Sequence, residues 1–143
     1  MAILRSIVAV IAGVVLGSLV NMALIMASGH VIPPPAGADM TTAEGLGAAM
    51  HLMEPRHFLF PFLAHALGTL VGAFVAAKVS RSHKRLCAGI VGVLFLIGGI
   101  MAARMIPAPA WFVALDLIGA YLPFAWLGHW LARSRSLQPT SVT

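Results

Sequence analysis

Apolar residues follow one another in four long stretches of the chain, and almost no charged side chain interrupts them. The stretches cover about residues 6–27, 58–77, 86–105 and 110–131. A helix that crosses the hydrocarbon core of a bilayer needs about 20 mainly apolar residues, and each stretch is close to that length. The pattern therefore predicts an all-α integral membrane protein in which residues 1–143 form one transmembrane domain, a compact bundle of four helices.

The composition excludes an ordinary soluble domain. Charged residues make up 9% of the chain and apolar residues 60%, whereas soluble domains carry a charge at about a quarter of their positions. The lipid bilayer is therefore the first partner that we expect. A single cysteine, Cys87, excludes an intramolecular disulfide and a thiol-pair redox motif.

The basic residues are distributed unevenly between the two sides of such a bundle. If the four spans alternate in direction, Arg56 and Arg104 lie on one side and the other seven basic residues lie on the opposite side. Lys and Arg concentrate on the cytoplasmic side of membrane proteins, so both termini and the loop of residues 78–86 are predicted to be cytoplasmic. This topology accounts for the net charge of +5, and we expect no nucleic-acid surface. The layout is typical of small bacterial inner-membrane proteins, which gives the predicted location.

The two halves of the chain share weak internal similarity. An offset of 51 residues pairs His65 with Asp116, and an offset of 74 pairs Ile32 with Ile106, each followed by a proline-rich run. A true duplication would make two parallel-repeat hairpins related by an axis along the membrane normal; chance similarity between apolar sequences is the alternative. Because the offset falls from 74 before the first outer loop to 51 after it, the first half must contain extra residues there. We place this insertion at about residues 36–57, in the first outer loop.

The insertion contains the signals of a short amphipathic helix. Thr41-Thr42-Ala43-Glu44 has the pattern of a capping box, and Leu46, Met50 and Met53 recur at helical spacing until Pro55 ends the pattern. We expect this helix to lie over the outer end of the bundle, either as a lid or as a segment resting among lipid headgroups. The polar tail of residues 134–143 is predicted to be disordered.

Two ionisable residues, His65 and Asp116, lie inside apolar spans, where such groups are costly and mark a functional site by default. Counted from the outer ends of their spans, they lie at a similar depth to Asn21 of the first span. Each continues a stripe of small residues, the feature by which membrane helices approach one another closely, so all three should face the bundle interior. Arg104, at the end of the third span, would either anchor the interface or neutralise Asp116 or an anionic substrate.

Two interpretations of the His65 and Asp116 pair remain open. The pair would either hold two helices in register or serve as a ligand anchor or proton relay. A separation beyond about 8 Å, with one of the two side chains facing lipid, would contradict a shared site, because a hydrogen bond requires about 2.7–3.2 Å. Pro123 and Pro61 lack an amide hydrogen and should loosen the fourth span and the start of the second.

A metal or haem site is a further hypothesis. His51, Glu54, His57, His65 and Asp116 could supply nitrogen and oxygen ligands, and Glu54-Pro55-Arg56-His57 has the Glu-x-x-His spacing of di-iron bundles. Methionines and histidines also gather toward the outer side, and thioether and imidazole are copper ligands. The sequence itself identifies no cofactor.

Three functions therefore follow from the pattern. The first is an outward-facing intramembrane polar pocket, formed by His65, Asp116, Asn21 and Arg104, that binds or moves a small solute, ion or proton. The second is an accessory subunit whose glycine stripes dock a larger membrane complex or a second copy of the chain. The third is a membrane-embedded metal- or haem-binding protein, and no nucleophilic triad is recognisable that would specify an enzyme.

Overall fold

The computed structural model describes residues 2–133, and these residues form helices without any strand. The long helices are α1 (Ala2–Val31), α3 (Leu59–Val79), α4 (Lys84–Met105), α5 (Ala110–Gly119) and α6 (Leu122–Ala132). The connection from α1 to α3 contains α2 (Ala43–Ala49) and two short 3-10 helices, η1 (Met50–Leu52) and η2 (Pro55–Phe58). The predicted disordered tail of residues 134–143 lies outside the described residues.

Four helical segments are long and apolar enough to cross a membrane. They are Ala2–Val31, Pro55–Val79, Lys84–Met105 and Ala110–Ala132, the last formed by α5 and α6 together. The prediction of an all-helical chain with four candidate spans is thereby confirmed, and the first helix extends several residues beyond the predicted span at each end.

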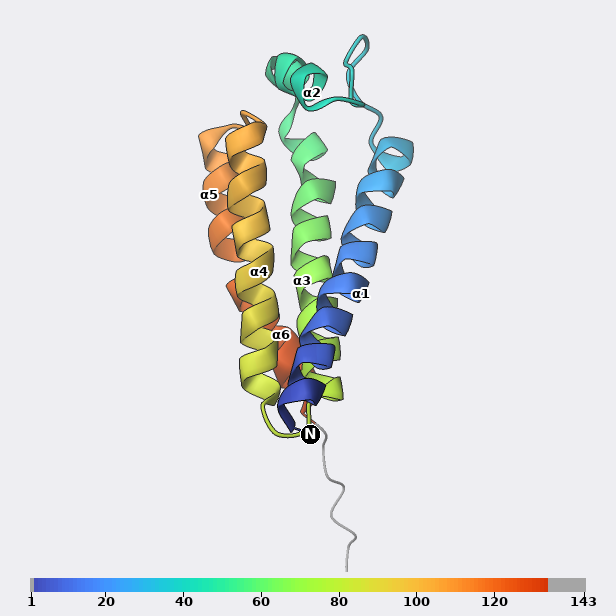
Figure 1. Cartoon of the computed structure of the whole chain (residues 1–143). Helices are drawn as coiled ribbons and strands as arrows, with labels where there is room; N and C mark the ends of the chain where they lie inside the picture. The colour runs from blue at the N-terminus through green and yellow to red at the C-terminus, as the bar shows by residue number, and fades with distance from the viewer. Residues whose placement is uncertain (1, 134–143) are drawn as a thin grey trace, which may run out of the picture.

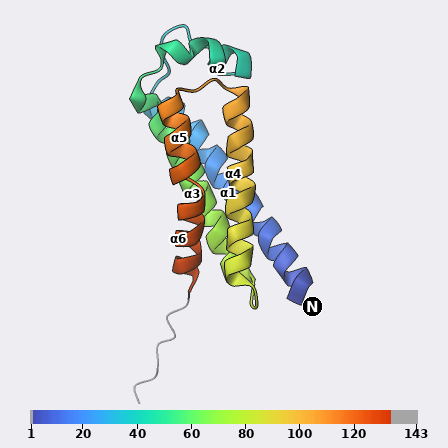
Figure 2. The same ribbon diagram turned by 90° about the vertical axis from the view of Figure 1, so that its left-hand side faces the viewer.

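Helix α3 occupies the centre of the bundle and packs against α1, α4 and α6 (Figure 1). The N-terminal end of α1, the loop between α3 and α4 and the end of α6 lie together at one end of the bundle, which we call the basic end (Figures 1 and 2). It carries Arg5, Lys78, Arg81, Lys84, Arg85 and Arg133. Helix α2 lies across the opposite end, the α2 end (Figure 2). The assignment of the basic end to the cytoplasm stays a prediction.

Glycines bring α1 and α3 into backbone contact. A Cβ atom added to Gly17 would lie 2.5 Å from the carbonyl oxygen of Gly68, and one added to Gly68 would lie 2.9 Å from that of Gly17. Gly13 and Gly72 face each other in the same way one turn further along. The small-residue stripes of α1 and α3 therefore face the bundle interior and are used within the chain, so they are not free to dock a partner.

The fourth span is interrupted between α5 and α6. Pro123 cannot donate a hydrogen bond to the carbonyl of Gly119, the last residue of α5, and it stands in the first turn of α6, where proline is tolerated. Ala120 and Tyr121 form the break. The expected loosening at Pro123 is thus present, whereas Pro61 lies in the first turn of α3 and does not interrupt that helix. Helix α3 has no break to match the one in the fourth span, and the internal repeat stays a prediction.

The insertion between α1 and α3 folds differently from the predicted capping box. The residue that caps α2 is Thr42, whose hydroxyl accepts a hydrogen bond from the amide of Gly45 at 2.9 Å, so the cap lies one residue later than predicted. Thr41 instead donates its amide and hydroxyl to Asp39, at 2.8 and 2.6 Å. These hydrogen bonds connect residues 39–45 at the start of α2. The helix ends at Ala49 and is therefore shorter than the predicted run to Pro55.

Candidate functional site

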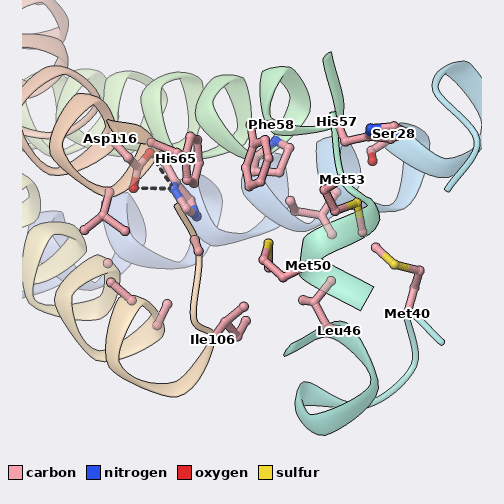
Figure 3. A pocket seen from close by; sticks show the side chains of 18 of the residues that line it. Ser28, Met40, Leu46, Met50, Met53, His57, Phe58, His65, Ile106 and Asp116 are labelled. Carbon is pink, nitrogen blue, oxygen red and sulfur yellow. Dashed lines mark hydrogen bonds and ion pairs between the residues drawn. The ribbon is translucent and has the colours of Figure 1, made fainter. Parts of the chain in front are cut away.

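A cavity of about 460 Å³ lies at the α2 end of the bundle, between α1, α3, α4 and α5 (Figure 3). Its walls are mainly apolar and include Ile25 and Met26 of α1 and Ala102 and Ala103 of α4. Side chains of the segment that contains α2 and η1 cover it from above: Met40, Leu46, Met50 and Met53. Its polar end is formed by His65 of α3 and Asp116 of α5.

His65 and Asp116 form a direct hydrogen-bonded pair. Nδ1 of His65 lies 2.8 Å from Oδ1 and 2.9 Å from Oδ2 of Asp116, so the ring donates from Nδ1–H to the carboxylate (Figure 3). The side chain of Asp116 is only 7% exposed and that of His65 is 22% exposed. The separation is far below the 8 Å that would have contradicted a shared site.

Tyr121 completes the environment of the carboxylate. Its hydroxyl donates to Oδ2 of Asp116 at 2.9 Å, and its ring stacks on the His65 ring with centroids 5.6 Å apart. Tyr121 is almost fully buried and fits because Gly99 of α4 has no side chain, since a Cβ there would collide with the tyrosine hydroxyl. Both oxygens of Asp116 therefore have a hydrogen-bond partner, and Oδ2 has two, as a polar group in an apolar setting requires.

The second ring nitrogen of His65 is left for the cavity. Within residues 2–133, Nε2 has no hydrogen-bond partner, and it is not among the buried unpaired atoms. The imidazole projects from α3 toward the cavity (Figure 3). Asp116 thus fixes which nitrogen points inward, as carboxylates do for histidines that bind ligands or metals.

Sequence reasoning missed Tyr121 because of the break in the fourth span. In a continuous helix, a residue five positions after Asp116 lies roughly 140° around the axis and points elsewhere. The interruption at Ala120 and Tyr121 turns the chain and brings the hydroxyl back to the carboxylate. The signal in the sequence was the combination of the only tyrosine in the chain with Pro123 two residues later.

The other two residues of the predicted pocket lie apart from the pair. Asn21 packs beside Gly68 on the α1–α3 contact, where its Oδ1 is buried without a partner among residues 2–133, and it does not line the cavity. Arg104 is exposed near the end of α4 and forms no ion pair within the described part of the chain. Equal depth was a good guide for the pair on α3 and α5, but it does not bring Asn21 or Arg104 to it.

The predicted metal ligands of the α1–α3 connection are engaged with their own neighbours. Nδ1 of His51 lies 2.8 Å from the carbonyl oxygen of Ala48, and Glu54 pairs with Arg56 at 3.0 Å. The Glu-x-x-His spacing serves a local purpose, because the amide of Glu54 donates to Nδ1 of His57 at 2.9 Å. Across residues 2–133, no three side chains from His, Cys, Asp and Glu come together as a metal-binding group.

Comparison of the chain with protein-family models, with curated proteins and with solved structures finds no match. The function of the cavity therefore has to follow from its own residues. An imidazole held by a carboxylate at the end of an apolar cavity can hydrogen-bond one group of an occupant or exchange one proton with it.

Proposed function

We propose that this chain is an inner-membrane protein whose cavity faces outward and binds a small solute, with His65 and Asp116 as the anchor. The observation that carries the proposal is the geometry of Nε2 of His65, which is oriented by Asp116 and open to the cavity. With the basic end in the cytoplasm, as the distribution of Lys and Arg favours, the cavity lies in the outer half of the bilayer.

The size and chemistry of the cavity support binding. Small-molecule sites are typically about 300–1,000 Å³, mostly apolar, with a few polar groups that orient the ligand. The cavity of about 460 Å³ has this character, with His65 and Asp116 at one end, and Ser28 and His57 toward the other (Figure 3).

A purely structural role explains the pair less well. An interhelical hydrogen bond in a membrane contributes about 1 kcal/mol, whereas an aspartate at the centre of a span costs about 2.5–3.5 kcal/mol on insertion scales. The bond from His65 and the bond from Tyr121 recover much of that cost. Neither bond involves Nε2 of His65. A molecule bound in the cavity would give Nε2 the hydrogen-bond partner that the helices do not provide.

The packing below the cavity favours binding over a continuous pathway. Toward the basic end, α1 and α3 meet at their glycines, and Val91 and Phe95 of α4 pack against α1. Besides Tyr121, the fully buried side chains with polar groups among residues 2–133 include Thr69, Ser80 and Asp116, and Thr69 bonds the carbonyl of His65 in its own helix. The buried Oδ1 of Asn21 has no partner among these residues. These contacts give no chain of polar groups from the pair to the basic end.

Native mass spectrometry of protein extracted in mild detergent tests this function. Gly29 lines the cavity and Gly98 does not, yet a Cβ at either position meets nothing within 4 Å, so the two glycines form a matched pair. Wild type and Gly98→Phe should carry an adduct of the same added mass, and Gly29→Phe should lose it. Bare protein in all three samples, or an adduct that Gly29→Phe retains, would contradict the proposal.

A further inference from the structure

The two helices that flank the cavity, α1 and α4, separate toward the α2 end (Figure 1). Nearer the basic end they are in contact, since Val10 and Val14 of α1 pack on the cluster around Val91. Beyond that level, Ile25 and Met26 on one side and Ala103 on the other line opposite walls of the cavity. The cavity therefore occupies the space that the divergence of α1 and α4 creates.

This space is open at the side of the bundle. Met26 lines the cavity and is nevertheless 70% exposed, and Ile25 and Gly29 on the same helix are also exposed. These residues belong to an apolar span, so the surface they expose lies against lipid chains. A molecule dissolved in the bilayer reaches the cavity past α1 without crossing a polar layer.

The end of the cavity that faces the α1–α3 connection is covered. Side chains of α2 and the following turns lie over the cavity, and these elements also contact the rest of the chain at two places. A Cβ at Gly47 would lie 3.3 Å from Cδ of Pro107 in the α4–α5 loop, so α2 packs on that loop. Nε2 of His57 lies 3.3 Å from the carbonyl oxygen of Pro33, which ties η2 to the end of α1. The side opening is therefore the less obstructed route.

The charges at the polar end select the head of the occupant. One proton shared between Nδ1 of His65 and the carboxyl group of Asp116 leaves the pair without net charge, whichever of the two groups carries it. A net charge in this setting is costly, and in either uncharged arrangement Nδ1 is engaged with Asp116 while Nε2 carries a hydrogen, so Nε2–H is a donor to the cavity. Its best partner is an acceptor without charge of its own, because an anion would bring the net charge to minus one.

From these observations we infer that the occupant is a lipid-soluble amphiphile with a neutral carbonyl head, which enters between α1 and α4 and accepts a hydrogen bond from Nε2 of His65. Its apolar tail leaves through the side opening into the bilayer. The inference rests on the proposed binding function and specifies its ligand class. A quinone ring and a lipid ester both supply such a carbonyl, and the experiment separates them.

Trp111 provides the measurement. Its ring packs edge-on against Phe58, with centroids 5.4 Å apart, and Phe58 and Phe112 line the cavity. Replacing the exposed Trp126 and Trp130 by phenylalanine leaves Trp111 as the only tryptophan. Quenching of its fluorescence is then followed with four probes in micelles: a dibrominated long-chain methyl ester, the corresponding carboxylate, a dibromoalkane and a decyl-substituted benzoquinone.

We expect saturable quenching by the ester or the quinone, with half-saturation at a concentration about tenfold below that of the dibromoalkane, the effect of one hydrogen bond. His65→Phe should abolish this difference between carbonyl probe and alkane. Gly29→Phe should weaken binding of every probe, whereas Gly98→Phe should leave it unchanged. Tighter binding of the ester would identify a lipid ester as the natural carbonyl group, and tighter binding of the benzoquinone would identify a quinone.

The failures of the two proposals are distinguishable. If the alkane or the carboxylate binds as tightly as the carbonyl probes, the inferred head is wrong and binding in the cavity stands. If no probe quenches saturably while the native adduct persists, the ligand does not come from the lipid phase, and the proposed function is retained. If both the adduct and the quenching are absent, both proposals fail.

Discussion

The two ends of the bundle are built from similar apolar helices and pack in opposite ways. Toward the basic end, Gly13, Gly17 and Gly72 let backbones touch, and Gly128 of α6 lies so close to α3 that a Cβ there would be 2.5 Å from the carbonyl oxygen of Leu70. Toward the α2 end, α1 and α4 enclose a cavity. Without a hydrophobic drive between helices in lipid, close packing is what holds the bundle, so the tight end carries the stability that the open end gives up.

The largest expected effect comes from breaking the tight end. In Gly17→Leu, the new side chain meets the Gly68 carbonyl and the backbone of Gly72, neither of which can move aside. Overpacking costs about 1–3 kcal/mol and more where backbone must shift, so we expect separation of α1 and loss of folded protein. Size-exclusion profiles and thermal unfolding in detergent measure this.

Gly98→Leu is the matched control, because a Cβ at Gly98 meets nothing within 4 Å. Equal stability of the two variants would show that the α1–α3 contact contributes nothing. Gly68→Leu would damage the same internal contact and therefore cannot report on docking to a partner complex.

A smaller effect is expected where the tight packing reaches the site. Gly99→Ala places a methyl group against the hydroxyl and ring of Tyr121 and should destabilise the protein by about 1–3 kcal/mol while weakening the bond to Asp116. Gly98→Ala, at the neighbouring position, should be neutral. Thermal unfolding measures the stability of the two variants. Identical curves would contradict the claim that Tyr121 needs a glycine at position 99.

Asp116→Asn separates stability from function at the open end. The amide keeps the shape but removes the charge that holds His65, so we expect a loss of about 1 kcal/mol in stability and at least a tenfold loss in ligand affinity. Native mass spectrometry and thermal unfolding read the two effects separately. Full ligand retention would leave the pair a purely structural role, as an accessory subunit would have.

The smallest effect concerns the connection that covers the cavity. Hydrogen bonds from the hydroxyl and then the amide of Thr41 lower the pKa of Asp39 from its usual 3.8. The stabilisation is therefore complete above pH 3.8 and is lost as the pH falls through the lowered pKa. The protection factor of the Gly45 amide, which corrects for the intrinsic pH dependence of exchange, should fall in that acidic range, and in Asp39→Asn it should be low at every pH. Unchanged exchange in both tests would show that Asp39 does not hold α2.

Much of the fold was predictable because the bilayer constrains it. The four spans follow from apolar length alone, and the meeting of His65 with Asp116 follows from equal depth on faces lined by small residues. Apolar length, depth and the face on which a residue lies can each be read from the sequence of a single helix, without knowledge of how the helices pack.

The rest depended on local geometry that helical periodicity does not encode. Tyr121 reaches Asp116 only because Pro123 breaks the span. Thr41 and Thr42 are both good helix caps. Asp39 accepts from the amide and the hydroxyl of Thr41, and it accepts only from the hydroxyl of Thr42, whose oxygen still caps α2 at Gly45. Asn21 has the expected depth but lies at the α1–α3 contact, where Gly68 lets the helices close around it.

The break in the fourth span also divides its attachment to the rest of the molecule. Helix α6 packs broadly on α3 and α4, whereas α5 touches α3 at few places, and the bond between His65 and Asp116 is one of them. The pair therefore holds α5 in position, in addition to its proposed role as the ligand anchor. Coupling between two equilibria is reciprocal. If a ligand strengthens or weakens the hydrogen bond between His65 and Asp116, a change in the position of α5 must change the affinity for that ligand to the same extent.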